Sequence, residues 1–294
     1  MRAYDHLVRL AALTGFALAG LVVTALMSAV IMMMSGMSIA EIMESSSGGM
    51  EGMTAGMIRG LLATQHLCVF ILPGILFGFI FHKMGFWKGF DLDLSPTWSL
   101  ILFGILFLIA GYPLVNLSFL LNEAILLPSW ATGFEAQAAD TLKSVLDMNT
   151  PWIFLLNLLL VAILPGIGEE LLFRGIIQKH VGGFLKNPIA GIWIAAIIFS
   201  AIHMQFEGFL PRLVLGALLG YLYYWTKNLW VPMIVHAFNN GIQVVLIYAM
   251  GVDIDEFEGG TSDELTWWMI ALSVLAMYFF YQQILKKKQP IEYS

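Results

Sequence analysis

The chain has 294 residues, of which 59% are hydrophobic and only 12% are charged, and its mean hydropathy is +0.83. A soluble domain carries about 25% charged residues, so this chain lacks the polar surface of a water-soluble enzyme and is predicted to be a membrane protein. The net charge of −6 argues against nucleic acid as a partner, because no basic surface is available to displace counterions from phosphates. The single cysteine, Cys68, excludes an intrachain disulfide, and the nearby His66 is predicted to be an interfacial or packing residue.

Apolar runs separated by polar or Gly- and Pro-containing segments predict an all-α polytopic fold with about eight transmembrane helices, since about 20 apolar residues cross the hydrocarbon core. Arg2 and Arg9 precede the first run as in a secretory signal. That run exceeds the usual length of about 7–15 residues and lacks a clear cleavage site, so it is predicted to be a retained span. Segment 35–58 is predicted to be a short amphipathic helix or a flexible loop. The runs are 10–34, 61–82, 98–127, 151–179, 188–205, 209–226, 229–250 and 266–285.

Lysine and arginine gather on one side of the predicted spans, and such residues are in excess in cytoplasmic loops. With the N-terminus inside, only Arg59, Lys143 and Arg212 lie outside, which predicts that both termini are cytoplasmic. The inside set is Arg2, Arg9, Lys83, Lys88, Arg174, Lys179, Lys186, Lys227, Lys286, Lys287 and Lys288. Acidic residues predict solvated outer loops, with cation binding as the alternative; they are Glu41, Glu44, Glu51, Asp253, Asp255, Glu256, Glu258, Asp263 and Glu264.

Three polar clusters interrupt the apolar runs, and an ionisable group at membrane depth is costly unless it is paired or hydrated. The segment PGIGEELLFRGIIQ contains Glu169, Glu170 and Arg174, and IIFSAIH contains His203. The third segment, VPMIVHAFNNG, contains His236, Asn239 and Asn240. Each of these groups is therefore a candidate for function.

The first cluster separates into two parts by helical geometry. Glu170 and Arg174 are four residues apart, so they share a helix face and are predicted to form a structural ion pair. Glu169 is rotated by about 100° from Glu170, and its carboxylate is left to take a proton from water. The alternative is that both glutamates share Arg174 at the cytoplasmic boundary.

His236 and Asn240 are also four residues apart, so an imidazole and a carboxamide can aim N–H donors at one point, as an oxyanion requires. Asn239 is rotated away and is predicted to make an interhelical hydrogen bond. His203 taken alone fits either a hydrogen-bonded packing residue or a catalyst.

Depth within the membrane permits a common cavity. With helix ends near 180, 188 and 229 and a rise of about 1.5 Å per residue, the candidate groups lie about 10 to 22 Å from the cytoplasmic loops. This is compatible with a cavity that opens to the cytoplasm. Pro165, Gly166 and Gly168 predict a break or kink just before Glu169.

The motifs EExxxR, FxxxH and HxxxN, read from EELLFR, FSAIH and HAFNN, follow one another on three hydrophobic segments. In this order the sequence resembles the CPBP family, which comprises the type II CAAX prenyl endopeptidases and their bacterial bacteriocin-processing or abortive-infection relatives. The resemblance covers about residues 150–245. It divides the chain into N-terminal spans (1–148), a catalytic core of helices 4 to 7 (149–250), and a last outer loop, span and basic tail (251–294).

The resemblance implies that Glu169 and His203 activate the attacking water, and that His236 and Asn240 form the oxyanion hole. Glu170, Arg174 and Phe199 would then support the site. Signatures of other membrane proteases, HExxH, GxGD and GxSxG, are missing from the sequence. No cofactor is therefore favoured. The alternative is a Zn²⁺ ion bound by Glu169, His203 and His236, with water in the fourth position.

The expected function is intramembrane hydrolysis of a peptide bond in a membrane-anchored or hydrophobic peptide, of the CAAX type or the bacteriocin or pheromone type. The short loops favour a bacterial inner-membrane protein. One alternative is a non-catalytic immunity or scaffold protein of the same family, against which the presence of all four candidate catalytic residues speaks. A transporter is a third possibility, but it does not explain the specific polar pattern.

Overall fold

The computed structural model describes residues 2–46, 53–251 and 266–287, and the elements in these ranges are all helical. The predicted all-α polytopic membrane fold is confirmed. Six helices are long and apolar enough to cross a membrane: Ala3–Met34, Ala55–Phe81, Trp98–Glu123, Pro151–Leu185, Trp230–Met250 and Trp267–Lys287. The predicted spans 188–205 and 209–226 are also helical but shorter, at 14 and 18 residues, so the count of eight is not confirmed.

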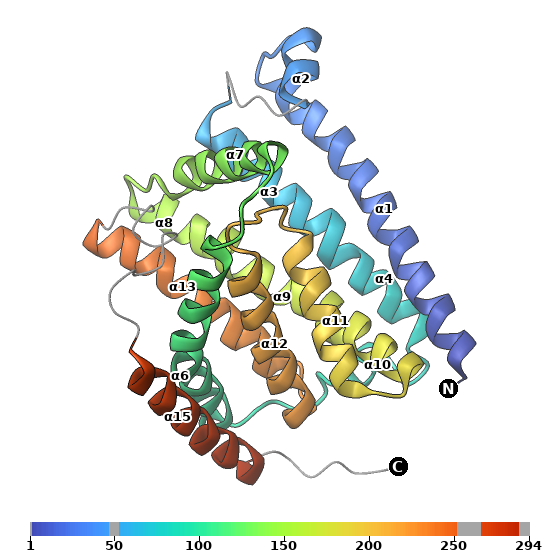
Figure 1. Ribbon diagram of the computed structural model, residues 1–294. Coiled ribbons are helices and arrows are strands. Elements are labelled where there is room, and N and C mark those ends of the chain that lie inside the picture. Colours follow the sequence, from blue (N-terminus) through green and yellow to red (C-terminus); the bar gives the residue numbers. More distant parts are fainter. Residues whose placement is uncertain (1, 47–52, 252–265, 288–294) are drawn as a thin grey trace.

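Within each described range the helices follow one another along the chain (Figure 1). The π-helical segments, labelled η, are parts of longer continuous helices. The elements are α1 (Ala3–Met34), α2 (Ile39–Ser46), α3 (Ala55–Gln65), η1 (His66–Ile71), α4 (Leu72–Phe81), α5 (Phe86–Gly89), α6 (Trp98–Glu123), α7 (Ser129–Leu146), α8 (Pro151–Asn157), η2 (Leu158–Ile163), α9 (Leu164–Leu172), η3 (Phe173–Gln178), α10 (Lys179–Leu185), α11 (Pro188–Ala201), α12 (Phe209–Thr226), α13 (Trp230–Met250) and α15 (Trp267–Lys287).

Among the described residues, the segments between the predicted spans contain three further helices, α2, α5 and α7. α2 lies in the segment 35–58, for which a helix was one of two expectations, and residues 47–52 of that segment lie outside the described part of the chain. α7 was not predicted. The acidic residues expected in the last outer loop also lie outside the described residues.

Two prolines widen the helices that contain them. Proline has no N–H, so Pro73 and Pro165 leave the carbonyls of Val69 and Val161 without the usual donor four residues on. Each proline follows a π-helical turn, η1 or η2, and each sits in nearly the same sequence, VFILPGI or VAILPGI. The break or kink expected at Pro165 therefore takes the form of a π-helical turn through which the helix continues.

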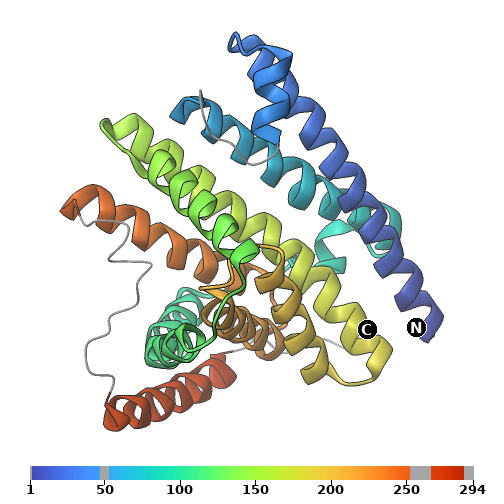
Figure 2. The same cartoon turned by 45° about the horizontal axis from the view of Figure 1, so that its top comes forward.

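Glycines allow α9 to lie close to its neighbours on two sides. A Cβ atom added to Gly168 would come within 3.0 Å of the Phe70 side chain in η1, and one added to Gly166 would lie 2.9 Å from Ala237 in α13. The helix formed by residues 151–185 accordingly passes between the α1, α3 and α4 layer and the helices α11 to α13 (Figure 2). The candidate residues on α9 are thus enclosed by helices from both halves of the chain.

A close contact between α1 and η1 gives a test of this packing. A Cβ atom at Gly20 would lie 2.0 Å from the carbonyl oxygen of Cys68, whereas one at Gly15 on the same helix meets nothing within 4 Å. We expect Gly20→Ala to lower the free energy of unfolding by about 1–3 kcal/mol, because the helices must separate. Denaturant unfolding in detergent measures this. Gly15→Ala is the matched control, and equal stability of both variants would contradict the packing.

Candidate active site

A buried ion pair lies at the base of the site. Glu170 and Arg174 are 0% and 1% exposed, and Nη1 of Arg174 donates to Oε1 of Glu170 across one helical turn. The predicted pairing is confirmed, and among the described residues Glu169 does not share Arg174 at ion-pair distance. Nη2 of Arg174 also donates to the carbonyl of Gly216 at 2.8 Å, which joins the pair to α12.

Glu170 also fixes the orientation of His236. The distance between Nδ1 of His236 and Oε1 of Glu170 is 2.8 Å. A carboxylate that is paired with arginine can only accept, so Nδ1 carries the hydrogen. The second ring nitrogen, Nε2, then faces Oε2 of Glu169 at 3.9 Å. Because hydrogen bonds to water span about 2.8 Å, one water molecule could contact both atoms.

Phe199 separates the two histidines of the site. Its ring centroid lies 4.9 Å from that of His203 and 5.9 Å from that of His236, and the Arg174 guanidinium lies 5.1 Å from it. Nδ1 of His203 donates to the carbonyl of Phe199 at 2.7 Å, so in the neutral imidazole Nε2 is the acceptor. His203 therefore belongs to the same cluster, but it is joined to it through Phe199.

A chain of hydrogen bonds leads from α6 to Asn240. The Tyr112 hydroxyl donates to Asn239 at 2.8 Å, Asn239 donates to Asn240 at 3.1 Å, and Nδ2 of Asn240 donates to the carbonyl of Val161 at 3.1 Å. Val161 is the residue whose carbonyl Pro165 leaves without a helical donor. The predicted interhelical bond of Asn239 is confirmed, and Asn240 keeps a second N–H with which to bind a ligand.

Exposure across the site increases in one direction. Glu170, Arg174 and Gln178, which follow one another toward α10, are buried. His203 and Asn240, which lie at the opposite end, are partly exposed. The more exposed end of the site is therefore the one that carries His203 and Asn240.

His66 lies beside the site, although the sequence had suggested only an interfacial or packing role. It is the first residue of η1, its Nδ1 is buried without a hydrogen-bond partner, and its ring lies 5.5 Å from Phe70. It is also close enough to interact electrostatically with His203 and His236. Only the packing of a distant span brings it here, so no local spacing could have indicated it.

The donor set proposed for zinc does not come together. Among the residues that the structure describes, no group of three or more His, Cys, Asp or Glu side chains is placed to hold a metal ion. Glu169, His203 and His236 as they lie here do not fit a three-ligand site.

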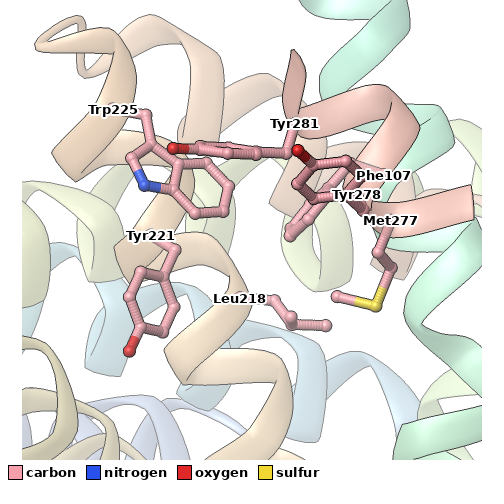
Figure 3. A pocket seen from close by; sticks show the side chains of 7 residues that line it. All are labelled: Phe107, Leu218, Tyr221, Trp225, Met277, Tyr278 and Tyr281. Atoms are coloured by element: carbon pink, nitrogen blue, oxygen red, sulfur yellow. The ribbon is translucent and has the colours of Figure 1, made fainter. Parts of the chain in front are cut away.

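A separate apolar hollow of about 290 Å³ lies between α6, α12 and α15 (Figure 3). Aromatic rings gather there, and no carboxylate, histidine or lysine lines it. Its walls are formed by Phe107, Leu218, Tyr221, Trp225, Met277, Tyr278 and Tyr281. The hollow can hold an apolar group but offers no chemistry for hydrolysis.

Residues 151–242 match the family model for type II CAAX prenyl endopeptidases, described as Rce1-like. The match contains every residue proposed for the site, and it confirms the predicted family resemblance. The fold and this match together define a polytopic α-helical membrane protein with an Rce1-like domain.

Two relatives illustrate the similarity. The chain is 34% identical over 84 residues to the uncharacterized protein YpbD of Bacillus subtilis, covering 27% of this chain and 40% of the relative. It is 32% identical over 90 residues to the membrane-embedded CAAX protease MroQ of Staphylococcus aureus, covering 29% and 36%. The aligned part is thus well under half the length of these relatives. No solved structure matches the chain.

The buried pair predicts a large loss of stability when one partner is removed. Glu170→Ala leaves the Arg174 charge buried without its carboxylate, and we expect the free energy of unfolding to fall by about 3–5 kcal/mol. Unfolding in mixed detergent micelles measures this. Lys88→Ala, at an exposed position, is the control. If Glu170→Ala lowered the free energy of unfolding no more than the control does, the ion pair would not stabilise the site.

Proposed function

We propose that this protein is an intramembrane endopeptidase that hydrolyses a peptide bond of a membrane-associated or hydrophobic peptide. One observation carries the proposal: the Glu169 carboxylate and Nε2 of His236 face each other at 3.9 Å, while Glu170 holds the opposite nitrogen of the same ring. A carboxylate and an oriented imidazole at this distance can bind one water molecule between them and a peptide carbonyl.

The ring orientation of His236 fits this use. Because Glu170 holds Nδ1, Nε2 is the ring nitrogen that faces the water and the substrate. In the proposed mechanism His236 donates an Nε2–H to the developing oxyanion.

The proposal gives each of these groups a role in hydrolysis. Glu169 takes a proton from water as the water oxygen attacks the peptide carbon, and the resemblance to the family implies that His203 assists in activating that water. The oxyanion accepts hydrogen bonds from His236 and from the second N–H of Asn240. When the C–N bond breaks, the proton on Glu169 passes to the leaving amine.

The substrate and location are part of the proposal. We expect a membrane-anchored peptide, of the CAAX type or the bacteriocin or pheromone type, because the relative MroQ is described as a membrane-embedded CAAX protease. The relatives are bacterial, which supports the bacterial inner membrane. The bias of lysine and arginine supports cytoplasmic termini.

Substitution of the four candidate catalytic residues tests the proposal. We expect Glu169→Gln to lower kcat about 10²- to 10⁴-fold through loss of the base, and His203→Ala to lower it through loss of the group that assists in activating the water. We expect Asn240→Ala to lower it about 10²- to 10³-fold through loss of an oxyanion donor, and His236→Ala to act in the same direction. Cleavage of a membrane-anchored reporter peptide by protein in detergent or vesicles measures these rates.

Glu207→Gln is the matched control, because Glu207 is an exposed carboxylate four residues after His203 and its side chain takes no part in the mechanism. Full cleavage by folded Glu169→Gln protein would exclude Glu169 as the base, and failure of the unsubstituted protein to cleave the peptide would contradict the hydrolase. A phenotype that survives all four substitutions would favour the immunity or scaffold alternative.

Removal of metal provides a separate test. Because the three proposed ligands do not form a metal-binding group, we expect a chelator to leave peptide cleavage unchanged and elemental analysis to find no stoichiometric zinc. Stoichiometric zinc whose removal abolishes cleavage, and whose return restores it, would contradict the metal-free mechanism.

A further inference from the structure

The connection between α11 and α12, residues 202–208, carries His203 and is the non-helical part of the site. His203 follows the last residue of α11 by two positions, and Met204 has a left-handed backbone conformation with a φ of +54°. In the part of the chain that the structure describes, the His203 ring is hydrogen-bonded to the carbonyl of Phe199, in the last turn of α11. The position of the imidazole therefore depends on how firmly this connection is held.

Asn122, at the end of α6, holds the connection on one side. Its side chain is 2% exposed, Nδ2 donates to the carbonyl of Phe206, and Oδ1 accepts from the backbone N–H of Leu210, both at 2.8 Å. α12 begins after Gly208, which provides no side-chain cap. The buried amide of Asn122 thus caps a helix from another element while also fixing the preceding loop.

Glu135, in α7, holds the same connection from a second side. One carboxylate oxygen accepts from two successive backbone N–H groups, those of Phe206 and Glu207, and the second contact measures 3.0 Å. The ring of Trp130, also in α7, packs edge-on against Phe206 with centroids 5.1 Å apart. Hydrogen bonds to a charged acceptor are stronger than neutral ones, so this contact is suited to fixing a loop.

α7 is itself anchored at its far end. Arg59, which is 7% exposed, donates to the carbonyls of Val145 and Asp147 at 2.8 and 2.9 Å, and to Asn157 at 3.0 Å. These contacts fix the C-terminal end of the helix that carries Glu135. In Figure 1, α7 accordingly lies across the ends of neighbouring helices.

We propose that Asn122 and Glu135 are positioning residues that hold the connection 202–208, and with it His203, in the geometry that hydrolysis requires. Both lie outside the Rce1-like segment 151–242. The inference rests on the proposed function for its catalytic consequence. Its structural part, that these two side chains restrain position 203, stands on the contacts alone.

Kinetics of Glu135 variants test the catalytic part. A misplaced group can reduce a rate by up to about 100-fold, so we expect Glu135→Ala to lower kcat about 10- to 100-fold with KM within about twofold. Glu135→Gln keeps an oxygen acceptor for both N–H groups and should retain most of the rate. Asp140→Asn, an exposed carboxylate on the same helix, is the control. Asn122→Asp keeps the acceptor for Leu210 and loses the donor for Phe206, so we expect an intermediate loss.

A double-mutant cycle separates positioning from general stability. If Glu135 acts through His203, adding Glu135→Ala to His203→Ala should lower the remaining rate by no more than about twofold. The same factor of loss in both backgrounds, or a Glu135→Gln variant as poor as Glu135→Ala, would overturn the proposal. Failure of the unsubstituted protein to cleave the reporter peptide would instead refute the proposed function.

A readout without activity tests the restraint directly. In a Cys68→Ser background with His203→Cys, the alkylation rate of the new thiol reports how often the connection opens. We expect Glu135→Ala to raise this rate about tenfold or more through local opening, and Asp140→Asn to leave it unchanged. An unchanged rate with Glu135→Ala in the folded protein would overturn the proposal whatever reaction the protein catalyses.

Discussion

The Glu170 carboxylate is fully buried, and two hydrogen-bond donors fix its position. Arg174 contacts it from the next turn of the same helix, and His236 contacts it from α13. Through the carbonyl of Gly216, Arg174 extends the same network to α12. A buried charge that loses a partner is strongly destabilising, so these three helices must pack in one relative position. The orientation of the His236 ring, and hence the point that Nε2 faces, follows from that constraint.

Pro165 contributes to the site because it has no backbone N–H to donate to the carbonyl of Val161. A carbonyl without its helical donor in an apolar environment needs another hydrogen-bond partner, and Nδ2 of Asn240 provides it to Val161. The same interaction fixes the carboxamide one turn from His236. Asn239 and Tyr112 restrain it from the other side. The missing hydrogen bond in the helix that contains Pro165 thus orients the Asn240 side chain of α13. In this way a helical protein can hold a polar group rigidly inside a membrane.

The features that could be predicted from the sequence are local ones. Apolar runs indicated the spans, and a spacing of four residues indicated that Glu170 meets Arg174, because both follow from the periodicity of a single helix. The same spacing paired His236 with Asn240, and the family motifs added a role for His203, for which helix geometry alone left two alternatives. His66, Tyr112 and α7 were missed because their places depend on packing between segments far apart in the chain. The expected number of eight spans is not confirmed, because α11 is shorter than the length that a full crossing usually needs.

The anchoring of α7 has a consequence for comparing proteins that share these motifs. The three motifs lie within residues 151–242, but the groups that brace the connection after FxxxH come from residues 122 and 135, and the anchor of α7 comes from residue 59. Two chains can therefore carry identical motifs and differ in how well the histidine of FxxxH is held. If Glu135 holds the connection as proposed, a relative that has the motifs but no activity should lack such a carboxylate between its third and fourth spans.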